Sequence, residues 1–143
     1  MGLKIQEDEN GFYHHVRSYM LLPETEIDYF EDIVEYAVKI VKSTKGVKYY
    51  HFKKDYVLAS SVKMHLLIIG EAAKNISTET KDKLPYIPWK RMTGLRNKLA
   101  HDYGEMLTEI IWLTAQNSIP ELLKELNKIA QLKEYIKQAR KMY

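Results

Sequence analysis

The sequence predicts an all-α protein, an antiparallel bundle of four to five helices. Apolar residues recur at spacings of three and four along most of the chain, as they do on one face of a helix. The connections between these tracts are short, which favours antiparallel neighbours. The composition, 45% hydrophobic and 29% charged, is typical of a folded globular domain, and 143 residues are enough for one such domain.

The first helix is expected from residue 25 to about residue 41, with Thr25 as its N-cap after Pro23. Its apolar face is expected to consist of Ile27, Phe30, Ile33, Val34, Ala37, Val38 and Val41. The stretch STKGVKYYHF, residues 43–52, breaks this period with serine, threonine and glycine, so we expect a loop there.

A longer second helix is expected from residue 53 to about residue 77. Gly70 lies inside it, where a glycine costs about 1 kcal/mol relative to alanine, so we expect it to permit close packing against a neighbour. The stretch STETKDKLPYIP, residues 77–88, is expected to be a short loop.

A third helix is expected at residues 88–103, because Pro88 suits a first turn and Gly104 suits a C-cap. A fourth helical tract is expected to begin near Leu107 and to kink or restart at Pro120, before a basic tail. Ser118 and Glu121 have the spacing of a capping box at that point.

Residues 23–143 are therefore expected to form one helical domain, and residues 1–22 a flexible or partner-contacting N-terminal extension. His14 and His15 stand side by side in this extension. Neighbouring residues of a helix point about 100° apart, and no carboxylate stands at ligand spacing, so a metal site is not expected there.

The composition also excludes several classes of function. The chain has no cysteine, which rules out disulfides, thiolate nucleophiles and cysteine-ligated metal centres. The longest strongly apolar run, residues 66–69, is far shorter than a membrane span, and the first residues are acidic where a signal peptide is apolar. We therefore expect a cytoplasmic protein with no membrane association. The net charge of +3 allows a polyanionic partner without requiring one.

The polar face of the third helix is the candidate active site. Counting about 100° per residue from Arg96, Asn97 falls near 100°, His101 near 140° and Gly94 near 160°, while Tyr103 falls beside Arg96 near 340°. The narrow apolar stripe that faces the core is expected to consist of Met92, Leu95 and Leu99.

This face suits the cleavage of RNA without a metal ion, by attack of a ribose 2′-hydroxyl on the neighbouring phosphate. His101 can accept or return a proton near neutral pH, and Arg96 supplies fixed donors for a phosphate and its transition state. The two side chains diverge by about 140° on one helix. We therefore expect a twofold dimer to combine two copies in one composite site.

The same residues also have purely structural interpretations, and spacing alone favours these. His101 lies at a helix end, where it can interact with the helix dipole. Arg96 can pair with Glu71 or Asp102, and Tyr103 can cover the edge of the core.

A family resemblance changes this balance. The stretch RNKLAHDY, residues 96–103, resembles the motif of an arginine, four residues, a histidine, one residue and a tyrosine in HepT-like toxins of the HEPN superfamily. The stretches IIGEAAKNIS at 68–77, IPWKRMTGLRN at 87–97 and IIW at 110–112 also resemble the family in order and spacing. The resemblance covers about residues 24–126.

The resemblance implies a HEPN-type bundle and a homodimer whose two Arg–His pairs share one cleft. It implies an endoribonuclease that uses neither a metal nor another cofactor. It also implies a partner, an MntA-like minimal nucleotidyltransferase antitoxin that silences the toxin by transferring AMP to the motif tyrosine, as in type VII-like toxin–antitoxin systems.

Carried onto this chain, the resemblance makes Arg96 the group that binds phosphate and stabilises the transition state, and His101 the general base or acid. Asn97 would orient His101 or the scissile phosphate, and Tyr103 would accept AMP. Glu71 lies in the matching GEA stretch, where it either supports Arg96 or makes a polar contact between helices.

Basic residues near the motif are candidates for RNA contact. Lys90 falls near 120°, on the His101 side, whereas Arg91 and Lys98 fall near 220° and 200° and do not share that side. A solvated helix face explains these lysines and arginines equally well.

A non-enzymatic function is the alternative. The protein would then be a nucleotide- or substrate-binding companion of a nucleotidyltransferase, although such a companion has no evident need for the complete motif.

Overall fold

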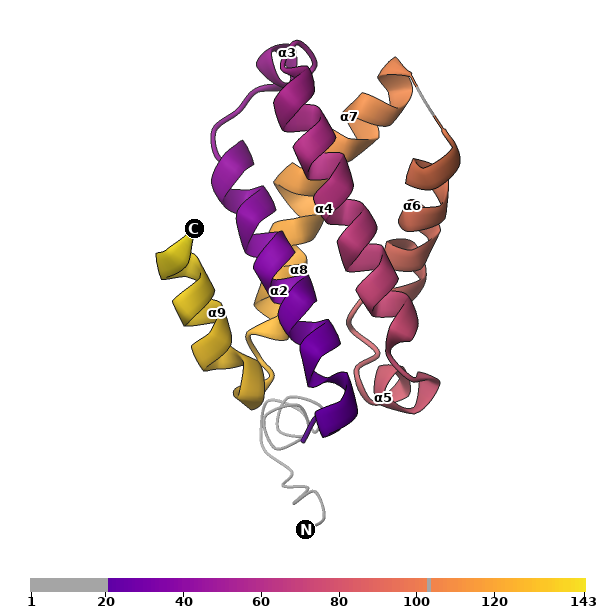
Figure 1. Cartoon of the computed structure of the whole chain (residues 1–143), viewed down its shortest axis with the longest axis vertical. Helices are drawn as coiled ribbons and strands as arrows, with labels where there is room; N and C mark the ends of the chain where they lie inside the picture. The colour runs from indigo at the N-terminus through magenta and orange to yellow at the C-terminus, as the bar shows by residue number, and fades with distance from the viewer. Residues whose placement is uncertain (1–20, 103) are drawn as a thin grey trace, which may run out of the picture.

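Four helical segments run up and down the molecule in antiparallel order, and a fifth packs beside the first (Figure 1). The structure is a computed structural model, and it describes residues 21–102 and 104–143. Within these residues there is no strand, so the predicted all-α antiparallel bundle is confirmed. In chain order the elements are α2 (Glu24–Thr44), α3 (Tyr49–Phe52), α4 (Tyr56–Asn75), α5 (Thr78–Lys83), α6 (Trp89–His101), α7 (Glu105–Leu113), the π-helix η1 (Thr114–Ser118), α8 (Ile119–Leu126) and α9 (Ala130–Met142).

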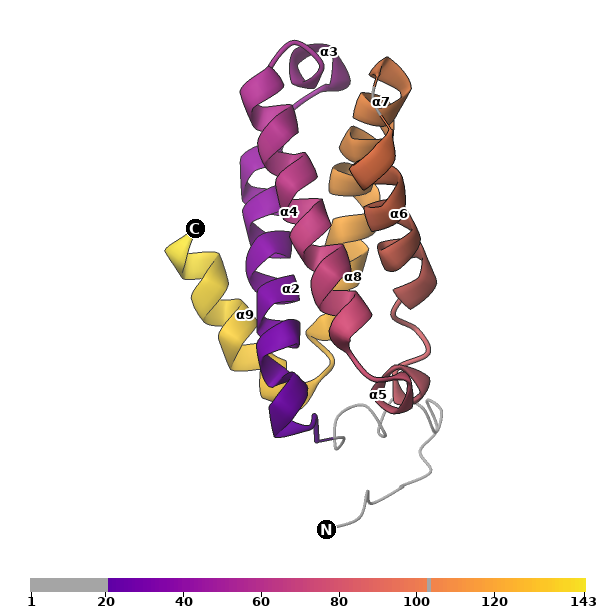
Figure 2. The same ribbon diagram turned by 45° about the vertical axis from the view of Figure 1, so that its right-hand side comes forward.

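Helix α4 lies at the centre of the bundle, packed between α2 and α6 (Figure 2). Helices α8 and α9 both pack against α2, which completes the core. Each large apolar side chain that is fully buried contributes about 1.5–3 kcal/mol to folding. Such side chains come from several helices and include Phe30, Ile33, Val38, Phe52, Leu99, Leu126 and Ile136.

Among the described residues, α4 is the one helix that is long and apolar enough to cross a membrane. The central helix of a bundle can have the same length and composition, because it is buried among other helices.

The first helix begins earlier and ends later than its apolar period indicates. Pro23 is the N-cap, with φ −58° and ψ 135°, and its carbonyl accepts a hydrogen bond from the Glu26 N–H at 2.9 Å. The prediction of Thr25 as the cap was therefore wrong, because the fixed φ of proline already sets the chain's entry into the helix. At the other end, the helix continues to Thr44.

Two short helices occupy the stretches that were expected to be loops. Helix α3 is a single turn, and α5 has six residues and is capped by the Ser77 hydroxyl, which accepts from the Thr80 N–H at 3.2 Å. The second helix begins at Tyr56, after Asp55 as its N-cap. Helices this short carry too few apolar positions to show a helical period in the sequence.

The turn between α6 and α7 differs from its prediction. Helix α6 ends at His101, and Asp102 is its C-cap in an extended conformation. Gly104 is instead the N-cap of α7, with φ 114° and ψ 178°. The prediction of Gly104 as a C-cap was wrong, although the glycine is needed, since side chains disfavour this backbone conformation.

The capping box predicted around Pro120 is also absent from the structure. Ser118 has helical angles, φ −71° and ψ −39°, and its side chain caps nothing. The chain passes from α7 through η1 into α8 without a break. Proline removes one helical hydrogen bond and crowds the carbonyl four residues before it, and the wider π-turn accommodates that conflict.

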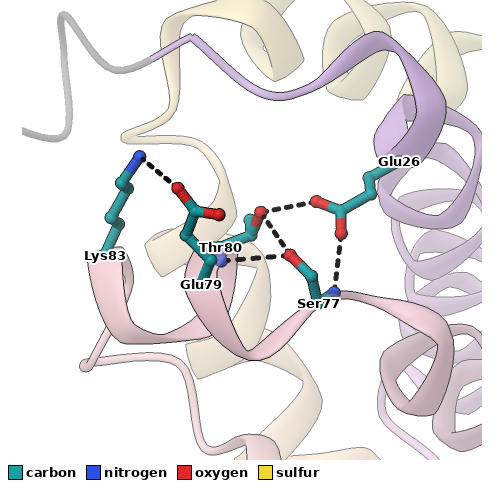
Figure 3. A network of polar contacts seen from close by, with 5 residues as sticks. All are labelled: Glu26, Ser77, Glu79, Thr80 and Lys83. Carbon is teal, nitrogen blue, oxygen red and sulfur yellow. Dashed lines mark hydrogen bonds and ion pairs between the residues drawn. The ribbon is translucent and has the colours of Figure 1, made fainter.

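The buried carboxylate of Glu26 connects the beginning of α2 to α5 through hydrogen bonds (Figure 3). Glu26 accepts hydrogen bonds from the Ser77 N–H at 2.6 Å and from the Thr80 hydroxyl at 2.5 Å. Burial alone would raise the pKa of Glu26, but these hydrogen bonds outweigh burial and the pKa lies below its usual value. On the exposed side of α5, Lys83 pairs with Glu79 at 3.7 Å.

Candidate active site

Helix α6 carries four of the predicted site residues, namely Lys90, Arg96, Asn97 and His101. Its inner face is the predicted apolar stripe, since Met92 and Leu99 are buried and Leu95 is half-buried against the core. This packing fixes the helix and leaves its polar face outward. Arg96 is half-buried at the edge of that face, whereas Asn97 and His101 are exposed.

Gly70 allows α6 to approach α4 closely at Arg96. A Cβ atom on Gly70 would lie 2.3 Å from the Cβ of Arg96, 2.9 Å from its Cγ and 3.0 Å from the carbonyl oxygen of Met92. Favourable carbon contacts lie at about 3.5–4.0 Å, so no larger residue fits without a shift of the helices. The prediction that Gly70 permits close packing is confirmed, and its neighbour is the motif arginine.

Among the described residues, the guanidinium of Arg96 contacts Glu71 and Asn97. Its Nε lies 3.3 Å from Oε2 of Glu71, and its Nη1 donates a hydrogen bond of 3.1 Å to Oδ1 of Asn97. The hydrogen bond that the structure gives the Asn97 side chain thus goes to Arg96 rather than to His101. Asp102, the other candidate partner of Arg96, pairs instead with Lys98 at 3.8 Å.

His101 lines a surface pocket of about 400 Å³ between the end of α6 and the start of α7. The other residues that line it are Lys98, Asp102, Met106 and Leu107. Sequence reasoning placed Lys98 away from His101 and missed the two apolar residues. A helical wheel of α6 cannot show how the Gly104 turn brings α7 back beside His101, although the Lys98–Asp102 pair has a readable i, i+4 spacing.

Lys90 lies at the opposite end of α6 from His101. It is exposed and lines a separate surface pocket with Lys81, Trp89 and Arg91 among others. Eleven residues of α-helix span about 16 Å, so one chain does not bring Lys90 and His101 together.

Several predicted features lie outside the described residues. These are Tyr103, the expected AMP acceptor, and residues 1–20, which include His14 and His15. Among the side chains that the structure describes, no group of three or more histidine, aspartate or glutamate residues is placed to hold a metal ion.

An apolar groove of about 330 Å³ opens beside the site, between α4, α6 and the α7–η1–α8 segment. Gly94 and Leu95 contribute one wall, and a Cβ atom on Gly94 would meet nothing within 4 Å. As far as the described residues show, this part of α6 is therefore open to a neighbouring molecule.

Comparisons with known proteins agree with these motifs. A family model described as ribonuclease HepT-like matches residues 33–129. A protein of Caldanaerobacter subterraneus subsp. tengcongensis, named as a candidate RNase, is 39% identical over 103 residues, which cover 72% of this chain and 92% of that protein. A similarly named protein of Methanocaldococcus jannaschii is 38% identical over 109 residues, covering 76% of this chain and 90% of that protein.

A third relative, the "Probable ribonuclease HepT" of Thermococcus cleftensis, is 36% identical over 102 residues, covering 71% of this chain and 93% of that protein. No solved structure matches the chain significantly. The family match spans well over half of the sequence and includes the whole of α6. The chain therefore belongs to the HepT-like family of the HEPN superfamily.

Proposed function

We propose that this protein is a ribonuclease toxin that cleaves RNA without a metal ion, at a site that two copies build together. The observation that carries the proposal is that α6 presents both motif residues, a half-buried Arg96 and an exposed His101, in a chain of the HepT-like family. The names of three relatives, each described as an RNase, support the same reaction class.

In the proposed reaction, the 2′-oxygen of a ribose attacks the adjacent phosphorus and the bond from phosphorus to the 5′-oxygen breaks. The products are a 2′,3′-cyclic phosphate and a 5′-hydroxyl. One His101 accepts the proton of the 2′-hydroxyl, and the His101 of a second copy donates a proton to the departing 5′-oxygen. Arg96 binds the non-bridging oxygens and stabilises their additional negative charge.

A homodimer is part of the proposal because the Arg96 and His101 side chains of one helix point in different directions and do not converge on one phosphate. Arg96 and His101 diverge by about 140° around α6. The open space over Gly94 and the apolar groove beside it support a second copy at this face. Two copies of α6 related by a twofold axis would place both Arg–His pairs along one cleft.

Regulation by AMP transfer completes the proposal. Tyr103 follows His101 by two positions, so an adenylyl group there would place a bulky anion at the mouth of a cleft that binds RNA phosphates. The partner would be an MntA-like minimal nucleotidyltransferase antitoxin of a type VII-like system, acting in the cytoplasm. Incubation with that enzyme and ATP should add one adenylyl group to Tyr103, and mass spectrometry that maps the group elsewhere would refute the assignment.

The catalytic proposal is tested with purified protein and total RNA in the presence of EDTA. We expect cleavage, and a loss of roughly 100-fold to 1,000-fold when either Arg96 or His101 is replaced by alanine. Cleavage that persists in the Arg96→Ala, His101→Ala double variant would exclude the mechanism. Tight nucleotide binding without cleavage of any RNA would instead favour the non-catalytic companion of a nucleotidyltransferase.

A further inference from the structure

We propose that Gly70 and Glu71 of α4 form a positioning element for Arg96, which fixes the guanidinium in the orientation that binds the scissile phosphate. The inference rests on the proposed function, since it assigns a role within the same site. It also chooses between the two interpretations of Glu71 that the sequence left open.

Gly70 determines how close the backbone of Arg96 comes to α4. A Cβ atom at position 70 would stand 2.3 Å from the Cβ of Arg96, a distance that real side chains do not adopt. Gly70 is itself buried, so no solvent-filled space is available to relieve the conflict. Any larger residue must push α6 outward, and the closest contact that it would make is with Arg96.

Glu71 acts on the other end of the same side chain. At the separation that Gly70 permits, Oε2 of Glu71 lies 3.3 Å from Nε of Arg96, and Asn97 accepts from Nη1 at 3.1 Å. These two contacts hold the guanidinium from two directions. Neither contact uses Nη2, and among residues 21–102 and 104–143 the structure gives that atom no partner. Its two hydrogens can therefore bind a phosphate.

The exposure of the pair argues against a role in folding alone. The side chains of Arg96 and Glu71 are 33% and 49% exposed. An ion pair this exposed contributes little to stability, so its main effect is on the orientation of the arginine. Glu71 also places a negative charge near the expected phosphate, which by itself would weaken RNA binding.

These opposing effects give Glu71→Gln a distinctive kinetic signature. We expect kcat to fall roughly 10-fold to 100-fold, because a misplaced catalytic group reacts poorly, while KM stays unchanged or decreases. The assay uses a short, fluorescently labelled single-stranded oligoribonucleotide that the unaltered protein cleaves. The matched control is Glu79→Gln on α5, which removes an 82% exposed carboxylate from an ion pair with Lys83 and should leave both constants unchanged.

Coupling to Arg96 separates positioning from an independent effect. In an Arg96→Ala background, Glu71→Gln should cause no further loss, because the group that it positions is gone. Gly70→Ala should lower kcat in the same way, with thermal unfolding as the check that the variant folds. If Gly70→Ala fails to fold, Glu71→Gln alone decides. A Glu71→Gln enzyme that matches the Glu79→Gln control, or losses that add fully to those of Arg96→Ala, would overturn the proposal.

Nuclear magnetic resonance of the arginine side chain tests the positioning element without any activity. In the full-length protein, the Nε–H of Arg96 should exchange slowly with water, and Glu71→Gln should make this exchange fast. An Nε–H signal that Glu71→Gln leaves unchanged would overturn the proposal even in an active enzyme. If the unaltered protein cleaves no RNA, the proposed function fails, whereas the exchange measurement still reports on the contact between Glu71 and Arg96.

Discussion

Arg96 and His101 differ in how firmly one chain holds them. Arg96 is in contact with Glu71 and Asn97 and lies against Gly70. His101 is the last residue of α6 and lines an open pocket. A general base works only when it is oriented toward the proton that it accepts, so we expect the second copy or the RNA to complete the orientation of His101.

His65 lies on α4, where it faces Tyr36 of α2. Its Nδ1 is buried without a hydrogen-bond partner among the described residues, and its ring lies 5.2 Å from that of Tyr36. Burial lowers the pKa of His65, the charge of Lys39 lowers it further, and Glu35 opposes them in part.

This environment predicts a pH-dependent loss of stability. Because the unfolded chain binds a proton on His65 more readily than the folded chain, the free energy of unfolding should fall as pH decreases from about 6.5 through the lowered folded-state pKa. His65→Phe should reduce this fall, measured by urea unfolding at about pH 7.5 and pH 5.5. The exposed His51 provides the control, since His51→Phe should leave this fall in the free energy of unfolding unchanged. An equal fall for His65→Phe and for the unaltered protein would contradict the assignment to His65.

Short contacts set the positions of helices that the apolar pattern leaves undetermined. Glu26 joins α2 to α5, and Gly70 brings α4 against α6. Gly104 then turns the chain so that α7 returns beside the end of α6. The pocket at His101 is a product of that turn.

Removal of the Glu26 carboxylate tests the first of these contacts. We expect Glu26→Gln to lower the free energy of unfolding by roughly 1.5–3 kcal/mol near neutral pH, because it weakens two charge-assisted hydrogen bonds. Since the folded-state pKa of Glu26 is lowered, its stabilisation is present above about pH 4.5 and is lost as pH falls through the folded-state value. The difference between the proteins should therefore shrink in acid. Chemical denaturation measures both effects, and a Glu26→Gln protein as stable as Glu79→Gln at neutral pH would refute the assignment.

The long helices could be predicted from the sequence because each repeats its apolar residues over several turns. The helices α3 and α5 could not, since they span four and six residues. The caps were harder still. Thr25 and Gly104 have the right chemistry for the predicted caps, but Pro23 and Asp102 occupy those positions, because a cap depends on where the chain goes next.

Only part of the candidate site could be predicted, because the sequence pattern gives the faces of a helix but not the contacts between side chains. A helical wheel separates the apolar stripe of α6 from its polar face, and the possible pairing of Arg96 with Glu71 could be named. That Asn97 contacts Arg96, and that Met106 joins the His101 pocket, depends on side-chain orientation and on the next turn of the chain. Spacing along one helix carries neither kind of information.

In the described part of the bundle, an apolar groove lies beside the candidate site. The groove has a volume of about 330 Å³ and runs along α6 next to Gly94. No described residue lies within 4 Å of the Cβ position of Gly94. These features support the proposed dimer contact on the same helix that carries Arg96 and His101.

A bulky charge at Gly94 tests whether the dimer is needed for activity. We expect Gly94→Arg to leave the chain folded, because nothing stands within 4 Å of its Cβ position, but to separate the copies and to lower RNA cleavage strongly. Analytical ultracentrifugation measures the first effect and a cleavage assay the second. Gln138→Arg, at an exposed position of α9, is the charge-matched control and should remain dimeric and active. A monomeric Gly94→Arg protein with full activity would show that one copy suffices.

The chemistry of the RNA ends distinguishes attack by the ribose 2′-hydroxyl from metal-dependent hydrolysis. RNA cleaved by the unaltered protein in EDTA should carry 2′,3′-cyclic phosphate and 5′-hydroxyl ends by mass spectrometry, and these ends should disappear with the Arg96→Ala, His101→Ala double variant. Cleavage that requires an added metal ion, leaves 5′-phosphate ends, or continues in the double variant would contradict the account.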